Sequence, residues 1–299
     1  AAAVMDALLA EGRIEGAVAL HYPFPMGVTT IGRMTCPASG RPMFMASSTG
    51  MSAPRRAGAM LRNAVLGAGV ARALGLSLPV LGVLNLEAAP QVVRALSHMV
   101  DKGYPVRLGE SIRRDGGALL RGNDLLCGAV DVCVTDTLTG NALMKVFASF
   151  TSGGARETCG WGYGPSVGEG WDKVISIVSR ASGAPVIAGA LRYTARAVRA
   201  DLPGKIREEL RLAAAAGLEA ELAALAPAPV PEEAVPPAAV PTDAELHGID
   251  VLDLEAAVHC LWRNGIYAEA AMGCTGPVIK LPARSREAAR QLLTAAGHL

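Results

Sequence analysis

A proline-rich run divides this sequence into parts that have to fold separately. The run, APAPVPEEAVPPAAVPT over residues 226–242, holds six prolines and no glycine. Proline fixes φ and lacks a backbone N–H, so the run cannot continue a helix or a sheet and favours an extended conformation. At about 3.1 Å per residue it could span roughly 50 Å. We expect a first domain over 1–225, a linker over 226–242 that is either a spacer or a tether, and a small domain over 243–299.

The first part alternates fully apolar runs with helical patterns. LPVLGVLNL (78–86) and VDVCVTD (130–136) have the length of buried strands, and helices are predicted over 55–75 and 141–150. GAPVIAGAL (183–191) is predicted as a further strand. Apolar strands separated by helices are typical of a mostly parallel sheet covered on both faces. We therefore expect a three-layer α/β/α domain. The glycine-rich stretch GWGYGPSVGEGWD, residues 160–172, is predicted as a mobile lid or an interface loop.

The terminal part predicts a small α/β domain. A helix is expected from Asp253, as N-cap, to Gly265, and a last helix is expected after Ser285. Two short strands lie between these helices and are joined by the turn GCTGP. This turn holds Cys274 between glycine, threonine and proline. Glycines let another molecule approach the thiol closely, which a cysteine used only for packing does not need.

Composition and charge exclude several classes of function. The net charge is +1, so no electrostatic argument favours a nucleic-acid partner. No apolar run approaches the roughly 20 residues that span a bilayer, and the start lacks the basic region of a signal peptide. The six cysteines form no CxxC pair and the five histidines show no ligand spacing, so we expect no metal. We expect a cytoplasmic protein with reduced thiols and no membrane partner.

The stretch VTDTLTGN, residues 134–141, is the strongest phosphate candidate. It leads from the end of a buried strand into a helix, and helix N-termini bind anions through free N–H groups and the helix dipole. In an open α/β sheet, ligands bind at the carboxyl ends of the strands. The alternative is that these residues only cap a helix. The candidates are Thr135, Asp136, Thr137, Thr139, Gly140 and Asn141.

Two further segments supply possible phosphate or partner contacts. SSTGM is predicted to follow a strand and precede a helix, so Ser47, Ser48 and Thr49 could form a second wall of the pocket. Ordinary helix capping is the alternative. SRASGAP places Arg180 next to a turn, either as a phosphate ligand or as a solvated surface arginine.

Several motifs resemble known acyltransferase families. GNDLLCGAVDVCVTDTLTGNALMKVFASF, residues 122–150, resembles the phosphate acyltransferases that make acyl-phosphate from acyl carrier protein. From about Tyr22 to the C-terminus the chain is similar to the alpha subunits of component C of the glycine, sarcosine and betaine reductase complexes. YPFPMGVTT, TDTLTGNALMK, GYGPSVGEGWD, SRASGAPVIA and LWRNGIYAEAAMGCTGP carry this second resemblance. That family begins upstream of Ala1, which leaves open whether residues precede it.

The resemblance implies a fold, an activity and partners. It implies a phosphotransacetylase-like sheet and a subunit that releases acetyl phosphate from a thioester, in amino-acid fermentation. Cys274 matches the active thiol, and N–H groups of Thr275 and Gly276 are candidates for an oxyanion site. Inorganic phosphate would be a substrate, with no tightly bound cofactor. The implied partners are a condensing-enzyme-like beta subunit and a small selenoprotein, component A, as acyl donor.

Two other functions stay open at this point. One is a stand-alone phosphate acyltransferase that makes acyl-phosphate from acyl carrier protein. The other is a non-catalytic scaffold for the beta subunit. The sequence does not select among glycine, sarcosine and betaine, and it does not give the oligomeric state.

Overall fold

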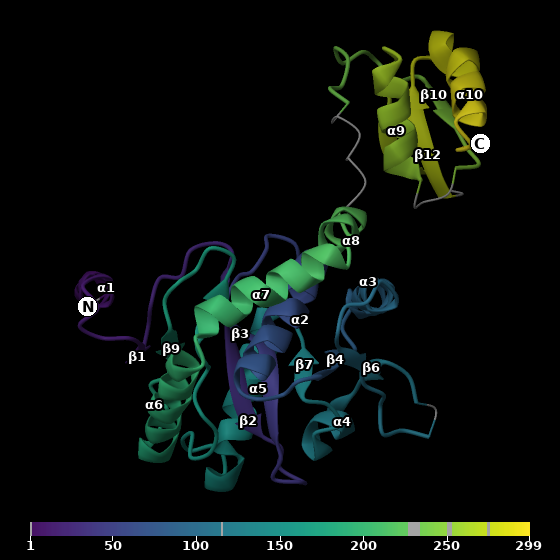
Figure 1. Cartoon of the computed structure of the whole chain (residues 1–299). Helices are drawn as coiled ribbons and strands as arrows, with labels where there is room; N and C mark the ends of the chain where they lie inside the picture. Colours follow the sequence, from purple (N-terminus) through teal and green to yellow (C-terminus); the bar gives the residue numbers. More distant parts are fainter. Residues whose placement is uncertain (1, 115, 227–233, 250–252, 274–275) are drawn as a thin grey trace. The chain divides into compact units, whose positions relative to one another are not determined.

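The protein divides into two compact units. The structure is a computed structural model that describes residues 2–114, 116–226, 234–249, 253–273 and 276–299. The units are Ala1–Ala226 and Pro227–Leu299, so the division falls at the start of the proline-rich run (Figure 1). No helix in these described ranges is both long and apolar enough to span a bilayer.

The first unit is built on a mixed sheet with mostly parallel strand pairs. Its strands are β1 (Ala17–Ala19), β2 (Val28–Thr35), β3 (Pro42–Gly50), β4 (Val80–Leu84), β5 (Arg107–Leu108), β6 (Leu119–Leu120), β7 (Val132–Val134), β8 (Ser166–Gly168) and β9 (Ile175–Ile177). Their order in the main sheet is β5-β4-β7-β3-β2-β8, with β6 also beside β4, while β1 and β9 form a separate parallel pair. β2 is antiparallel to β3 and β8, and the other pairs of the main sheet are parallel.

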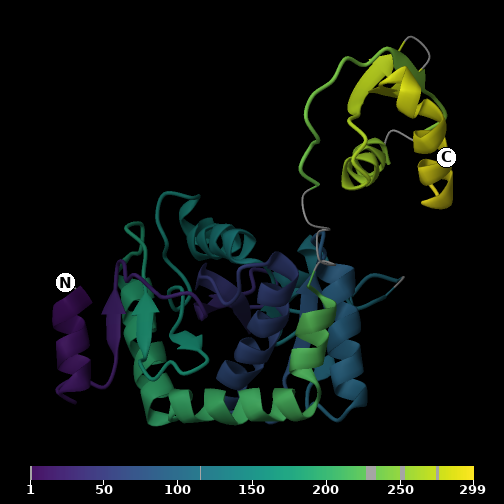
Figure 2. The ribbon, with the colours of Figure 1, turned by 90° about the horizontal axis from the view of Figure 1, so that it is seen from above.

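Helices cover both faces of this sheet. The helices of this unit are α1 (Ala2–Ala10), α2 (Arg56–Ala73), α3 (Ala89–Asp101), α4 (Gly122–Cys127), α5 (Thr137–Ser149), the 3-10 helix η1 (Phe150–Ser152), α6 (Ala184–Arg199), α7 (Leu202–Ala215) and α8 (Leu218–Ala224). Figure 2 shows α7 (green) and α5 (teal) on opposite sides of the sheet. The predicted three-layer α/β/α architecture is confirmed.

Side chains that alternate in direction along the strands pack into two separate cores. Successive strand residues point to opposite faces. Ala46 and Val132 therefore pack in the cluster under α2 and α3, whereas Met45 and Cys133 pack in the cluster that holds Met144 of α5. Apolar residues at every position of β7, and over residues 43–46 of β3, pack in both layers, which is why these stretches are continuous apolar runs in the sequence.

The second unit is a small antiparallel sheet with two longer helices. Its elements are β10 (Ala244–Leu246), α9 (Leu254–Arg263), β11 (Glu269–Gly273), β12 (Gly276–Leu281), the 3-10 helix η2 (Ala283–Ser285) and α10 (Arg286–Ala295). The strand order is β10-β12-β11. Leu261, Ile279 and Leu293 are fully buried between helices and sheet. The predicted helices and the two strands around the GCTGP turn are confirmed, but neither Asp253 nor Ser285 makes a side-chain cap hydrogen bond.

Two predicted elements of the first unit are wrong. Residues 183–191, predicted as a strand, form the first half of α6, because Gly183 precedes the helix and Pro185 lies in its first turn, where proline is well tolerated. Residues 160–172, predicted as a lid or interface loop, contain β8, which pairs with β2. Gly164 has φ of +86°, and a Cβ there would lie 1.7 Å from the Ile31 carbonyl oxygen, so this glycine permits tight packing.

A buried ion pair joins α2 to α7. The Glu209 carboxylate is 1% exposed, accepts a hydrogen bond from Tyr104 Oη at 2.6 Å, and lies 2.7 Å from Arg72 Nε. The Nε–H of Arg72 is not aligned for a hydrogen bond, so this contact is mainly electrostatic. Arg72 also donates to the carbonyl oxygens of Ser77 and Pro105. Burial raises the pKa of Glu209, and the hydrogen bond from Tyr104 and the Arg72 charge oppose that rise.

We expect Arg72→Met to lower the free energy of unfolding by about 3 kcal/mol, because it leaves a buried carboxylate without its cation. Urea unfolding followed by circular dichroism measures this change. Arg207→Met on α7 removes an exposed arginine and is the control, with an expected change within about 0.5 kcal/mol. Equal effects of the two substitutions would show that the buried pair does not stabilise the unit.

Candidate active site

Helix α5 lies unusually close to strand β3. A Cβ at Gly140 would lie 1.8 Å from the carbonyl oxygen of Ser47, so only glycine allows this approach. The next residue, Asn141, donates from Nδ2 to the carbonyl oxygen of Ser48 at 2.8 Å. The contact brings together the two sequence segments that were predicted to form a phosphate pocket.

The N-terminus of α5 already faces a carboxylate of the protein. The helix begins at Thr137 rather than at residue 141, and Asp136 is its N-cap. The two Asp136 carboxylate oxygens accept from the backbone N–H and the hydroxyl of Thr139, at 2.9 and 3.1 Å. Arg56 Nε lies 4.0 Å from the same carboxylate. A negative group therefore occupies the position that the helix dipole favours.

The hydroxyl groups of β3 are engaged inside the protein. Ser47, Ser48 and Thr49 lie within the strand, so the prediction that they follow it is wrong, whereas a helix, α2, does come next in the chain as predicted. Ser48 Oγ donates to the carbonyl oxygen of Tyr163 at 2.6 Å. Ser47 Oγ contacts the hydroxyl of Thr137 at 3.1 Å. These contacts fasten α5 and the segment before β8 onto β3.

Thr135 differs from the other predicted phosphate residues. It is fully buried, and its Oγ1 has no hydrogen-bond partner among the described residues. Its carbonyl oxygen accepts from Asn63 Nδ2 at 3.1 Å, and its backbone N–H donates to Ala46. The backbone of Thr135 thus continues the pairing of β7 with β3 and links it to α2.

A cavity of about 190 Å³ opens at the carboxyl ends of β1, β3 and β9. Its lining combines an apolar wall with seven side chains that carry a polar group. The lining residues are Leu20, His21, Tyr22, Thr49, Asn141, Lys145, Tyr163, Ile177, Val178 and Ser179. Carboxyl ends of strands are where open α/β sheets bind ligands. Asn141 and Lys145 are four residues apart, so they lie on the same face of α5.

A chain of hydrogen bonds holds Lys145 at this cavity. Lys145 Nζ donates to Tyr163 Oη at 3.0 Å and lies 4.7 Å from the centre of the Tyr163 ring. Tyr163 Oη in turn donates to the carboxylate of Glu157, which is 2% exposed. Ser179 and Ser182 also donate to Glu157, at 2.7 and 2.5 Å. Burial, and then the contact with Glu157, raises the pKa of Tyr163, so the phenol stays protonated.

Only a few donors in the cavity are free to meet an anion. A hydroxyl has one proton, and those of Thr49 and Ser179 go to the Ser48 carbonyl oxygen and to Glu157. Lys145 uses one of its three N–H groups on Tyr163, and Asn141 uses one of its two on Ser48. A bound anion would therefore find two N–H donors from Lys145, one from Asn141 and a ring N–H of His21. This combination of a cation and an amide suits a phosphate or a carboxylate.

Sequence reasoning missed Lys145, Tyr163 and Glu157. The spacing of Lys145 from Asn141 was an available signal, because residues four apart share a helix face. Nothing in the sequence links Glu157 to Ser179 and Ser182.

The remaining predicted residues have different positions. Arg180 is exposed beside the cavity residue Ser179, Gly276 begins β12 opposite Gly273, and Cys274 and Thr275 lie outside the described residues.

Two of the described cysteines are poor nucleophiles. Cys36 and Cys133 are buried in the core under α5. Burial raises the pKa of Cys36 to about 11 and that of Cys133 to about 12. Thiolates are the reactive form, so these two protonated thiols serve packing rather than acyl transfer. Among the described residues, no group of three or more possible ligands could hold a metal ion.

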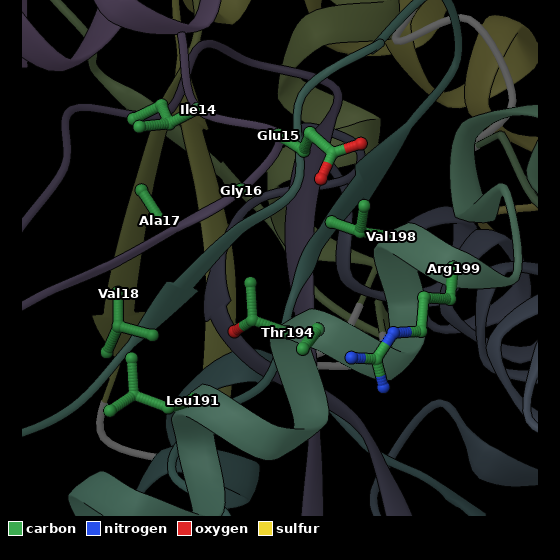
Figure 3. A pocket seen from close by; sticks show the side chains of 10 residues that line it. Ile14, Glu15, Gly16, Ala17, Val18, Leu191, Thr194, Val198 and Arg199 are labelled. Atoms are coloured by element: carbon green, nitrogen blue, oxygen red, sulfur yellow. The ribbon is translucent and has the colours of Figure 1, made fainter.

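A larger cavity of about 410 Å³ lies between β1 and α6. Figure 3 shows its mostly apolar side chains, including Ile14, Val18 and Leu191, with Glu15 and Arg199 as the charged members. The charges of Glu15 and Arg199 are opposite, so this cavity has no net positive lining for an anion. Lys145 and Asn141 therefore mark the smaller cavity as the candidate active site.

The chain matches a family model over nearly its whole length. Residues 1–280 match the family described as fatty acid synthesis protein, so the chain belongs to this family. It is also a homologue of the glycine/sarcosine/betaine reductase complex component C subunit alpha of Peptoclostridium acidaminophilum, with 47% identity over 298 residues. The alignment covers 98% of this chain and 77% of the relative. The resemblance inferred from the sequence motifs is confirmed.

Two solved structures of phosphotransacylases are similar to parts of the chain. A branched-chain phosphotransacylase from Enterococcus faecalis V583 aligns with a TM-score of 0.42 and 17% identity, over 64% of this chain and 76% of that one. The EutD phosphotransacetylase from Staphylococcus aureus aligns with a TM-score of 0.37 and 13% identity, over 65% of this chain and 64% of that one.

We expect Tyr163→Phe to lower the free energy of unfolding by about 1–3 kcal/mol, because it deprives the buried Glu157 carboxylate of a donor. Tyr267→Phe is a matched control, since the Tyr267 hydroxyl also donates to a glutamate, Glu269, but in an exposed contact. Its expected change is within about 0.5 kcal/mol. Urea unfolding of both variants tests this, and equal stabilities would contradict the assigned role of Tyr163.

Proposed function

We propose that this protein transfers an acetyl group from a cysteine thioester to inorganic phosphate and so forms acetyl phosphate, as a subunit of a glycine reductase-type complex. The near full-length homology to a component C alpha subunit carries this proposal. The cavity beside α5 supports it, because its free donors include those of Lys145 and Asn141. The thioester is assigned to Cys274 on its sequence motif.

The donors of the cavity fit the phosphate substrate. Phosphate is a compact anion, and an ammonium with two free N–H groups offers a charge-assisted pair of hydrogen bonds. The Asn141 amide adds one donor from the same face of α5. The Glu157 carboxylate is negative, but its oxygens accept hydrogen bonds from three hydroxyl groups, and these groups separate it from the anion. The cavity therefore presents a net positive lining to its ligand.

The proposed step is an acyl substitution without a change of oxidation state. A phosphate oxygen attacks the carbonyl carbon of the acetyl thioester, and a tetrahedral oxyanion forms. The carbon–sulfur bond then breaks, and the Cys274 thiolate leaves with the electron pair. The products are acetyl phosphate and a thiolate that takes up a proton from solvent or stays ionised. Thiolates are good leaving groups, and N–H donors of the turn, at Thr275 and Gly276, would stabilise the oxyanion.

We propose that other components of the complex supply the acetyl group. The name of the homologue describes a subunit of component C in a reductase complex. A condensing-enzyme-like beta subunit and the selenoprotein component A are the proposed partners, with component A as acyl donor. The proposal requires the thioester to reach the bound phosphate, and a proline-rich sequence of this length could span roughly 50 Å when extended.

Cavity size favours a short acyl group. The volume of about 190 Å³ is below the range of roughly 300–1,000 Å³ that is typical of pockets for drug-sized ligands. Tyr22 and Ile177 belong to the apolar wall of this cavity. An acetyl group with phosphate suits this space better than a long acyl chain, which a phosphate acyltransferase acting on acyl carrier protein would have to hold.

We expect Cys274→Ala to abolish acetyl phosphate formation, because it removes the sulfur that carries the acyl group. Mass spectrometry of the full chain after incubation with acetyl phosphate should show one added acetyl group on the wild type and none on the variant. Cys260→Ala, in the same unit, is the control and should keep both. Acetylation of Cys274→Ala, or turnover close to that of the wild type, would refute the role of this thiol.

We expect Lys145→Met to raise the KM for phosphate at least about tenfold, since it removes a charged hydrogen-bond donor worth roughly 1.5–3 kcal/mol. Asn141→Ala should raise it less, because a neutral amide contributes less than an ammonium. Lys205→Met removes an exposed lysine on α7 and is the control. Phosphate dependence of acetyl phosphate formation measures all three, and an unchanged KM in Lys145→Met would exclude this cavity as the phosphate site.

A further inference from the structure

Tyr22 is the largest side chain on the apolar wall of the candidate active-site cavity. It lies in the segment between β1 and β2, is 8% exposed, and lines the cavity together with Ile177 and Val178. Residues 20–27 form neither helix nor strand, so side-chain contacts have to fix the ring in place. Two sets of contacts do so, one to the hydroxyl group of Tyr22 and one to its ring.

An ion pair anchors the hydroxyl group. Tyr22 Oη donates to Asp6 Oδ1 at 2.7 Å, and Lys173 Nζ donates to the same oxygen at 2.6 Å. The hydrogen bond from Lys173, and then the one from Tyr22, lower the pKa of Asp6, so this carboxylate stays ionised and keeps accepting. Met5 and Leu9, its neighbours on α1, pack on the core cluster that contains Tyr22. The acceptor therefore has a fixed position of its own.

Two aromatic neighbours hold the ring. The ring centres of Phe24 and Trp171 lie 5.0 and 6.2 Å from that of Tyr22, distances at which aromatic pairs attract each other. Phe24 and Trp171 also contact one another edge-on at 6.1 Å. Trp171 Nε1 donates to Ser166 Oγ of β8 at 2.8 Å, which ties this aromatic group to the sheet. The Tyr22 ring is therefore a rigid part of the cavity wall.

We propose that Tyr22 limits the length of the acyl group that this protein transfers, and that Asp6 and Lys173 are positioning residues for its ring. This inference rests on the proposed acyl transfer and adds the residue that selects the acyl group. Phosphate at Lys145 and Asn141 leaves the acyl group the remainder of a cavity of about 190 Å³. A wall that is held at both its hydroxyl group and its ring does not give way to a longer chain.

The expected discrimination follows from size. A butyryl group has two methylene groups more than an acetyl group, and one methylene in a pocket of fixed shape changes kcat/KM by about 10–200-fold. Loss of a single large buried side chain can open a cavity on the order of 150 Å³ that binds apolar molecules. Removal of the Tyr22 ring should therefore make room for the two extra methylene groups.

Acylation of Cys274 by acyl phosphates measures the preference. This reaction is the reverse of the proposed step, because the Cys274 thiolate attacks the acyl carbonyl carbon and phosphate leaves with the electron pair of the carbon–oxygen bond. Mass spectrometry of the full chain gives the rates with acetyl phosphate and with butyryl phosphate. Cys274→Ala gives the background acylation of other groups. We expect the wild type to react at least about tenfold faster with acetyl phosphate.

Tyr22→Ala should raise the ratio of the butyryl rate to the acetyl rate at least about tenfold. Tyr22→Leu fills more of the vacated space and should raise the ratio less, and circular dichroism establishes that both variants are folded. Asp6→Ala should also raise it, because the hydroxyl group loses its acceptor, whereas Asp6→Asn keeps an acceptor and should preserve the wild-type ratio. Leu78→Ala removes an exposed side chain before β4 and is the control, with no expected change.

The outcomes distinguish this inference from the proposed function. If wild-type Cys274 is acetylated but folded Tyr22→Ala and Tyr22→Leu keep the wild-type ratio, the inference is overturned and the acyl transfer stands. Equal rates of the wild type with both donors overturn it as well. If neither donor acylates wild-type Cys274, the proposed acyl transfer fails, and the inference fails with it. An unchanged ratio in Asp6→Ala contradicts the positioning role of Asp6.

Discussion

The close approach of α5 to β3 is the contact on which the candidate site depends. At Gly140 the helix backbone lies so near the Ser47 carbonyl oxygen that no side chain fits between them. The Asn141 amide then reaches the Ser48 carbonyl oxygen, and one turn later Lys145 reaches the cavity. A helix held farther from the sheet would carry both donors away from the carboxyl ends of the strands. Gly140 thus affects the site because it lets the α5 backbone approach β3, and not because it contacts a ligand.

Glu157 provides the second constraint, from the other side of the cavity. A buried carboxylate is costly unless donors satisfy it, and here Tyr163, Ser179 and Ser182 do so. These hydroxyl groups come from the segment before β8 and the segment after β9, so one carboxylate joins both. Because Tyr163 also accepts from Lys145, the position of the amine depends on the same network. The Glu157 network therefore fixes the positions of Tyr163 and Ser179 at the cavity through polar contacts.

Much of the fold could be predicted because strands buried on both faces are apolar at nearly every position. The same argument failed at residues 183–191, where apolar and small residues occur in a helix that is packed closely against neighbouring backbone. The site was harder to predict. Hydroxyl groups in the 134–141 stretch suggested phosphate ligands, but Asp136 and Thr139 bind each other. The Lys145 amine depends on Tyr163 and Glu157, whose contacts with distant serines no local pattern encodes.

Helix α5 has three distinct faces. The face with Gly140 and Met144 anchors α5 to the sheet, the face with Asn141 and Lys145 lines the cavity, and the face with Ala142 is exposed. Asp136 already fills the anion-favouring N-terminus, so the helix contributes to anion binding through side chains instead of its dipole. The contribution of α5 to anion binding therefore depends on where the sheet contact at Gly140 places two side chains, those of Asn141 and Lys145.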